Sequence, residues 1–171
     1  MIKTTPIALF DNESNWVNRL QSIINKGELW ICTYSIPRGD SIVPLLIHDR
    51  AGMDTVLVCN PTANKVIERA YMLKKHYPLM RIILHPRVHA KMVLIDNYSF
   101  ISTENFGSNE GWFERTVCIQ DKEIHDKNLE DLKTFLRKNP GVSMDTNYSI
   151  DVYFNRFQPL SKSGVKPLMG I

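Results

Sequence analysis

One ten-residue run, Arg87-Val-His-Ala-Lys-Met-Val-Leu-Ile-Asp96, most constrains the fold of this chain. Apolar and β-branched residues dominate the run, which predicts a strand buried on both faces. Only His89 and Lys91 interrupt its apolar pattern. Because strand side chains alternate between two faces, these two are expected to point to one side and Ala90 to the other. A buried imidazole and ammonium need polar partners or a bound anion, so the run predicts a functional site.

Polar groups suited to such a site follow within a short stretch of sequence. Thr103 offers a hydroxyl, Asn105 an amide and Glu114 a carboxylate. A nucleophilic nitrogen, a fixed cation, neutral donors and one acid together suit a phosphodiester. The cation and the donors hold the non-bridging oxygens while the imidazole attacks phosphorus. The alternative reading of His89 and Lys91 is a satisfied polar pair near a sheet end.

The spacing His89-x-Lys91-x4-Asp96 resembles the signature of the phospholipase D superfamily. In that family a Gly-Ser-x-Asn element follows, and then a Glu that heads another strand. This chain has Ser102-Thr-Glu-Asn105 and then Glu114 at nearly that spacing. Ser102 stands where Gly is usual and Thr103 where Ser is usual, and threonine keeps the hydroxyl. With a single copy of the motif, the chain is similar to the small bacterial endonuclease branch.

The resemblance implies a metal-independent phosphodiesterase that works as a homodimer, with both motifs meeting at the two-fold axis. One His89 would form a phosphohistidine, and the partner subunit's His89 would protonate the leaving oxygen and then activate water. Glu114 would accept a hydrogen bond from His89 and fix its orientation. No cofactor is implied, because the lysine supplies the positive charge. The phosphoryl oxygens would be stabilised by Lys91, Thr103 and Asn105, with Asp96 and Ser102 in structural roles.

The charge distribution favours a nucleic acid among the substrates of that family. Formal net charge is only +3, but residues 60–95 hold seven basic residues and a single acid. A basic region beside the site would attract a polyanion, although a solvated helix face is the other reading. Lipid hydrolysis or phosphatidyl transfer, and a nucleic-acid-binding module without turnover, remain alternatives. The expected nucleic-acid contacts are Lys65, Arg69, Lys74, Lys75, Arg87, Arg115 and, by stacking on bases, Trp112.

Strands that alternate with helices predict an α/β fold, a mixed sheet flanked by helices on both faces. We expect one phospholipase D-like domain over residues 1–157 and a flexible tail over 158–171. The segment 149–157 is expected to be one more strand or an arm. The expected helices are 11–26, 41–50, 62–76 and 121–138, and the expected strands are 28–35, 55–59, 80–84, 87–96, 98–102 and 113–119.

Composition excludes several other classes of protein. With 43% hydrophobic and 23% charged residues, the chain is typical of a folded domain rather than a disordered one. No apolar run is long enough for a membrane span or a secretory signal, so we expect a cytoplasmic protein with no membrane partner. The three cysteines lie in apolar runs and are expected to be buried free thiols. His85 and His89 have no metal-binding spacing on a strand, and no metal site is expected.

Overall fold

The computed structural model describes residues 6–10, 20, 23, 27–36, 50–103, 105 and 114–157. The expected helices at 11–26 and 41–50, the tail at 158–171 and Trp112 lie outside these residues, apart from Leu20, Ile23 and Arg50. The described helices are α3 (Val66–His76), α4 (Lys122–Lys138) and α5 (Ile150–Phe157). The strands are β1 (Ile7–Phe10), β2 (Leu29–Thr33), β3 (Thr55–Cys59), β4 (Arg81–Leu84), β5 (Met92–Ile95), β6 (Tyr98–Ser102), β7 (Thr116–Gln120) and β8 (Val142–Ser143).

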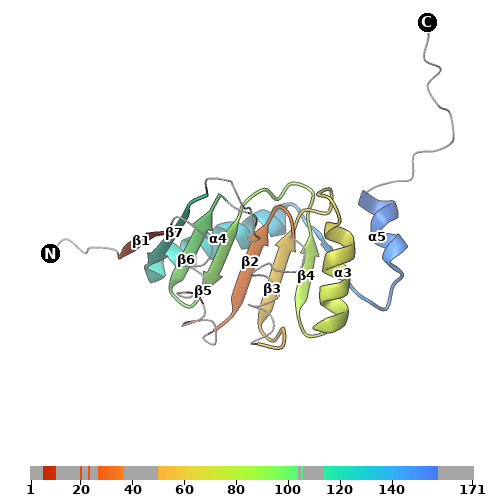
Figure 1. The fold of residues 1–171 in the computed structure, drawn as a ribbon, viewed down its shortest axis with the longest axis horizontal. Helices are drawn as coiled ribbons and strands as arrows, with labels where there is room; N and C mark the ends of the chain where they lie inside the picture. The colour runs from red at the N-terminus through yellow and green to blue at the C-terminus, as the bar shows by residue number, and fades with distance from the viewer. Residues whose placement is uncertain are drawn as a thin grey trace, which may run out of the picture.

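All eight strands form one mixed sheet in the order β1-β7-β6-β5-β2-β3-β4-β8 (Figure 1). The strands β2, β3 and β4 run parallel to one another, and the other neighbouring pairs are antiparallel. Every residue of β2 and β3 is buried. Burial of both faces explains why these strands are continuous apolar runs rather than alternating ones. The expected mixed sheet is confirmed.

Alternation along the strands divides the core into two layers, one on each face of the sheet. Ile31 belongs to the layer under α3, where it packs with Val66 and Ala70. Its neighbour Trp30 points the other way and packs with Leu132 of α4. Figure 1 shows α4 passing behind the strands, and α3 beside β4. Helices therefore flank both faces, as the sequence predicts.

The ends of several strands lie next to the motif along one border of the sheet. This border of strand ends, as opposed to an outermost strand, is here called the site edge. At the site edge β2, β3, β4 and β6 end, and β5 and β7 begin. In open α/β sheets, ligands bind outside the carboxyl ends of the parallel strands. The site edge is therefore where this fold would place a substrate.

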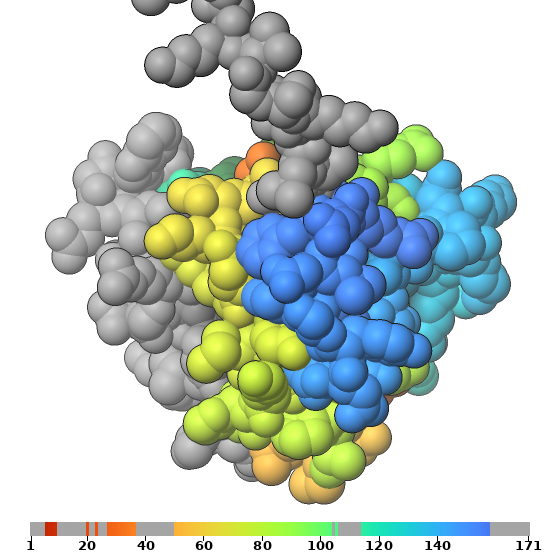
Figure 2. All heavy atoms as spheres, turned by 90° about the vertical axis from the view of Figure 1, so that its right-hand side faces the viewer, coloured from red at the N-terminus to blue at the C-terminus, as the bar shows by residue number. Residues whose placement is uncertain are grey.

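Two predicted elements differ from the structure. Residues 149–157 form a helix, α5, rather than a strand or an arm. Tyr153 of α5 packs against Tyr71 of α3, with ring centroids 6.5 Å apart, and Tyr71 Oη donates to the carbonyl of Tyr148 (2.9 Å). Figure 2 shows α5, in blue, lying against α3, in yellow-green. In addition, the strand expected from residue 87 begins only at Met92.

The cysteine prediction is confirmed, because Cys32, Cys59 and Cys118 are all buried and free. Burial raises the pKa of the Cys32 thiol to about 12, and it also raises the pKa of Cys59. Within the described ranges, no helix combines the length and apolar character that crossing a membrane would require.

Candidate active site

The segment that carries the motif, residues 85–91, is an ordered connection between β4 and β5 rather than a strand. A turn brings the amide of Val88 to the carbonyl of His85 (3.2 Å). The ladder between β5 and β6 extends one step outward, because Ser102 N donates to Lys91 O (2.9 Å). The backbone on both sides of His89 is therefore fixed by hydrogen bonds. The turn at residues 85–88 precedes the strand, which begins only at Met92.

Asn60, which directly follows β3, anchors the same segment through hydrogen bonds of its side chain. Its buried amide nitrogen donates to the carbonyls of Pro86 (2.8 Å) and Val88 (2.9 Å). Its Oδ1 accepts from the amide (2.9 Å) and the hydroxyl (2.7 Å) of Thr62. Both donors and both acceptor positions of the side chain are thus used. No local pattern marks this residue, because its partners lie 26 and 28 positions further on.

Asn60→Asp is expected to destabilise the protein and to lower its turnover. A carboxylate cannot donate to Pro86 and Val88, so two carbonyls lose their donor and a negative charge is buried beside them. We expect the free energy of unfolding to fall by about 2–4 kcal/mol. Urea denaturation measures this loss, with Asn64→Asp as a control at an exposed asparagine. Equal stability of the two variants would contradict the role of Asn60.

His89 and Lys91 share one aromatic neighbour, Tyr34, which follows directly after β2. The centroids of the His89 and Tyr34 rings lie 5.0 Å apart at an interplanar angle of 52°. The Lys91 Nζ atom lies 5.9 Å from the centroid of the same Tyr34 ring. His89 is exposed and Lys91 half-buried, so a ligand can reach both. Their common contact with Tyr34 puts both side chains on one side of the segment, although this segment is not the strand from whose alternation that placement was predicted.

Thr103 and Glu114 meet at the site edge, where β6 ends and β7 begins. The Thr103 hydroxyl donates to the Glu114 carboxylate and accepts from the Arg115 amide (3.0 Å). Ser102 Oγ lies 2.9 Å from Thr116 Oγ1, inside the ladder. Among the described residues, Ser102 is not one of those with a positive φ, so a side chain fits where the family has glycine. The expected hydrogen bond from His89 to Glu114 is not among those formed within the described ranges.

Asn105 is the third expected neutral partner, and its environment is unusual. The residue is half-buried, and its Oδ1 atom is buried without a hydrogen-bond partner. A buried acceptor without a partner costs free energy. A phosphoryl oxygen is itself an acceptor, so the amide nitrogen of Asn105, and not this oxygen, is the atom that could donate to it.

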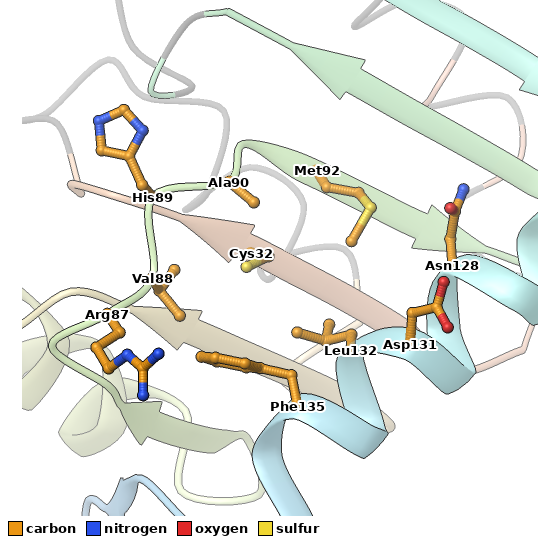
Figure 3. Close-up of a pocket in the computed structure, with 10 residues that line it drawn as sticks. All are labelled: Cys32, Arg87, Val88, His89, Ala90, Met92, Asn128, Asp131, Leu132 and Phe135. Carbon is orange, nitrogen blue, oxygen red and sulfur yellow. The ribbon is translucent and has the colours of Figure 1, made fainter. Parts of the chain in front are cut away.

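A groove of about 420 Å³ lies between the motif segment and α4 (Figure 3). Figure 3 shows Val88 facing Phe135 and Leu132 across it, with the His89 imidazole pointing away. The groove is therefore on the opposite side of the segment from the imidazole. It is lined by Cys32, Arg87, Val88, His89, Ala90, Met92, Asn128, Asp131, Leu132 and Phe135.

The expected basic residues of α3 do not gather in one place. Lys65 precedes the helix and is exposed on the side of the site edge. Lys74 lies at the opposite end, where its Nζ donates to the carbonyls of Pro78 and Met80 (both 2.6 Å). Lys75 lies over the Tyr71 ring, at 5.2 Å from its centroid. With a rise of about 1.5 Å per residue, Lys65 and Lys75 are roughly 15 Å apart along the helix.

The remaining basic candidates differ in how they are held. Arg69 is half-buried and donates to the carbonyl of Ile36, which ties α3 to the end of the segment after β2. Arg87 is exposed, with its guanidinium donating to Asn139 Oδ1 (2.9 Å). Arg115 is exposed beside Thr103 at the site edge. Of the expected contacts that lie in the described part of the chain, Lys65, Arg87 and Arg115 are therefore the exposed ones near the site edge.

Asp96 lies at the other end of β5 from His89, in the turn to β6. Its backbone is left-handed, with φ of 55°, a conformation that aspartate tolerates better than most residues. The side chain is exposed. This position fits a structural role in the β5–β6 turn.

His85 is occupied by protein contacts and is not placed to bind a metal. Its Nδ1 accepts from the amide of Arg87 (3.2 Å), so its Nε2 carries the proton and donates to the carbonyl of Asn139 (2.9 Å). Within the described ranges, no group of three or more His, Cys, Asp or Glu residues is placed to hold a metal ion.

Comparison with known proteins shows the fold. No family model matches the sequence, and no curated protein sequence matches it. The solved structures with a similar fold include the following three. NucT from Helicobacter pylori has a TM-score of 0.63 and 15% identity, over 82% of this chain and 100% of that chain. Nuc from Salmonella typhimurium, a phospholipase D family member, has a TM-score of 0.59 and 16% identity, over 82% and 97%.

The third similar structure is TrmBL2, an archaeal chromatin protein whose structure shows a mode of DNA binding. Its TM-score is 0.54 and its identity 11%, over 77% of this chain and 52% of that chain. The fold expected from the motif is thus confirmed: this chain has the phospholipase D-like fold.

Proposed function

We propose that this chain is a phosphodiesterase of the phospholipase D superfamily that cleaves DNA or RNA without a metal ion. The observation that carries the proposal is the shared placement of His89 and Lys91. An exposed imidazole and an ammonium lie on one side of a hydrogen-bonded segment, at the edge where ligands bind in open α/β sheets. A nucleophile beside a fixed cation is the pair that attack on a phosphodiester needs.

In the proposed reaction, a ring nitrogen of His89 attacks phosphorus and the bond to the leaving oxygen breaks. The partner subunit's His89 gives its proton to that oxygen, so the leaving group departs as an alcohol. The same imidazole then takes a proton from water, which attacks the phosphohistidine and releases His89. This exchange of roles requires a homodimer in which the two motifs face each other.

The neighbouring groups have proposed roles in holding the phosphoryl oxygens. Lys91 supplies the positive charge, and the amide of Asn105 supplies a neutral hydrogen bond. The Thr103 hydroxyl has one proton, so it donates to a phosphoryl oxygen only after it turns away from Glu114. Glu114 accepts that proton before substrate binds, and we propose that this hydrogen bond is exchanged for the one to the phosphoryl oxygen on binding. We assign its other carboxylate oxygen to the His89 ring nitrogen when substrate is bound.

A nucleic-acid substrate is supported by the charges around the site edge. Lys65 and Arg115 are exposed at the site edge, where a phosphate backbone that reaches His89 would pass, and Arg87 is exposed on the groove side of the motif segment. The DNA binding described for TrmBL2 supports the same class of ligand. Lys74 and Lys75, at the other end of α3, are no longer part of the proposed path.

The proposal is tested by incubating the purified protein with plasmid DNA, with RNA and with phosphatidylcholine vesicles, each with and without EDTA. We expect cleavage of a nucleic acid at the same rate in both conditions. Loss of cleavage on chelation would contradict the metal-independent mechanism. Cleavage of the lipid alone would point to a lipid hydrolase, and tight DNA binding without any cleavage would point to a binding module.

A further inference from the structure

We propose that Tyr34 is a positioning residue for both catalytic groups, in that its ring holds the Lys91 ammonium and fixes the orientation of the His89 imidazole. The inference rests on the proposed function, since it concerns the same site. Tyr34 touches neither phosphorus nor the leaving oxygen in this scheme. Its effect passes through the two side chains that do.

The Tyr34 ring is itself anchored, which makes it a suitable support. The residue is half-buried and packs against the core layer under α3. The chain bends directly after β2, and the Thr33 hydroxyl donates to the carbonyl of Ser35 (2.8 Å) across that bend. The ring packs on the core, and a hydrogen bond stabilises the backbone bend beside it. The ring therefore presents a fixed surface toward the site edge.

The strand register explains how one ring reaches both groups. In the β2–β5 pair, Cys32 lies opposite Met92. Continuing that register outward places Tyr34 level with Ala90, between the two functional residues. The bend then turns the ring toward the side on which His89 and Lys91 lie, at 5.0 Å between ring centroids and 5.9 Å from Nζ to centroid.

Both contacts limit side chains that would otherwise be mobile. An ammonium within about 6 Å of a ring centroid is attracted to the face of the ring. Lys91 has a flexible four-carbon stem, so this attraction selects conformers that keep its charge beside His89. His89 is exposed, and its contact with the ring limits the rotamers it can adopt. Groups placed before substrate arrives need less reorganisation in the transition state.

The test compares Tyr34→Leu with Tyr34→Phe, using the phosphodiester bis(4-nitrophenyl) phosphate as substrate. We expect Tyr34→Leu to lower kcat by a factor on the order of 10–100, because reacting groups are misplaced. KM should change by less than about threefold, since the substrate-binding groups remain. Tyr34→Phe keeps the ring and should keep kcat within about threefold of the wild type.

Tyr71→Leu is the matched control for general damage to the fold. Tyr71 is also half-buried, packs on the same core layer and carries a lysine, Lys75, over its ring. If Tyr71→Leu loses as much kcat as Tyr34→Leu, the effect is one of stability and the proposal is overturned. An unchanged kcat in Tyr34→Leu, or an equal loss in Tyr34→Phe, would overturn it too.

A second measurement needs no turnover. Diethyl pyrocarbonate modifies exposed imidazoles, and mass spectrometry reports the rate at each histidine. We expect His89 to react several-fold faster in Tyr34→Leu but not in Tyr34→Phe, with the exposed His76 as an internal reference. Equal rates in all three proteins would overturn the proposed contact. If the wild type cleaves no phosphodiester, the proposed function fails, and this measurement still decides whether Tyr34 holds His89.

Discussion

His89→Asn is expected to abolish turnover while nucleic-acid affinity stays within a few-fold of that of the wild type. Removing a covalent nucleophile typically lowers kcat by a factor on the order of 10⁴ or more. Asparagine is similar in size and polarity but cannot form the phosphohistidine. His89 is exposed at the end of an ordered segment, so the substitution should leave the fold intact. Plasmid nicking and a DNA-binding titration measure the two properties separately.

A second histidine provides the control for this substitution. His76 is also exposed and also lies against a tyrosine ring. The centroids of the His76 and Tyr77 rings are 5.1 Å apart. It lies at the end of α3 away from the site edge, so His76→Asn should leave turnover unchanged. Near-normal turnover in His89→Asn would mean that another residue is the nucleophile.

The His89→Asn variant also tests whether two subunits share one active site. If each reaction uses one His89 from each subunit, a mixed dimer of wild type and His89→Asn is inactive. After random exchange of equal amounts, about a quarter of the dimers are fully wild type, so activity falls to about half that of the unexchanged mixture. Unchanged activity after exchange, or an active monomer, would contradict the homodimeric mechanism.

Lys91→Met is the substitution with the second largest expected effect. Methionine keeps much of the apolar stem of lysine but removes the ammonium that is proposed to face the phosphoryl oxygens. Loss of one preorganised donor typically lowers kcat by a factor on the order of 10²–10³, or about 3–4 kcal/mol in the barrier. Steady-state kinetics on the substrate that is cleaved measures the change.

Lys133→Met on α4 is the matched control for Lys91→Met. Lys133 is also half-buried and also lies over an aromatic ring, 5.2 Å from the centroid of Trp30, but it is not at the site edge. Any loss common to both variants reflects packing of the lysine stem on a ring. A loss confined to Lys91→Met reflects the charge. Equal kinetics for the two variants would exclude Lys91 from the reaction.

Sequence reasoning succeeded where a local pattern decides the structure. The buried strands β2 and β3 are short continuous apolar runs, and α4 begins at Asp121, whose side chain accepts from the amides of Glu123 and Ile124. The helix α5 was predicted wrongly although its signal was present. Ile150, Tyr153 and Phe157 recur at helical spacing, and their contacts are with the core layer under α3.

Other features depend on long-range contacts that no local pattern contains. The edge strands β1 and β8 span only four and two residues, too short for a period to show. The support of His89 by Tyr34 and Asn60 depends on strand order, which brings β2 and β3 beside a segment much later in the chain. The basic residues of α3 appeared contiguous in sequence, but the helix places Lys65 and Lys75 at opposite ends.

The buried thiols make the subunit arrangement directly measurable. A thiol with a pKa of about 12, as burial gives Cys32, forms almost no thiolate at neutral pH and reacts very slowly with maleimides or methanethiosulfonates. Cys59 and Cys118 are buried as well. A cysteine introduced at an exposed position such as Asn64 would then take a spin label without competition from the native ones. Pulsed electron paramagnetic resonance on that sample would then measure the distance between the spin labels at residue 64 in two associated copies of the chain.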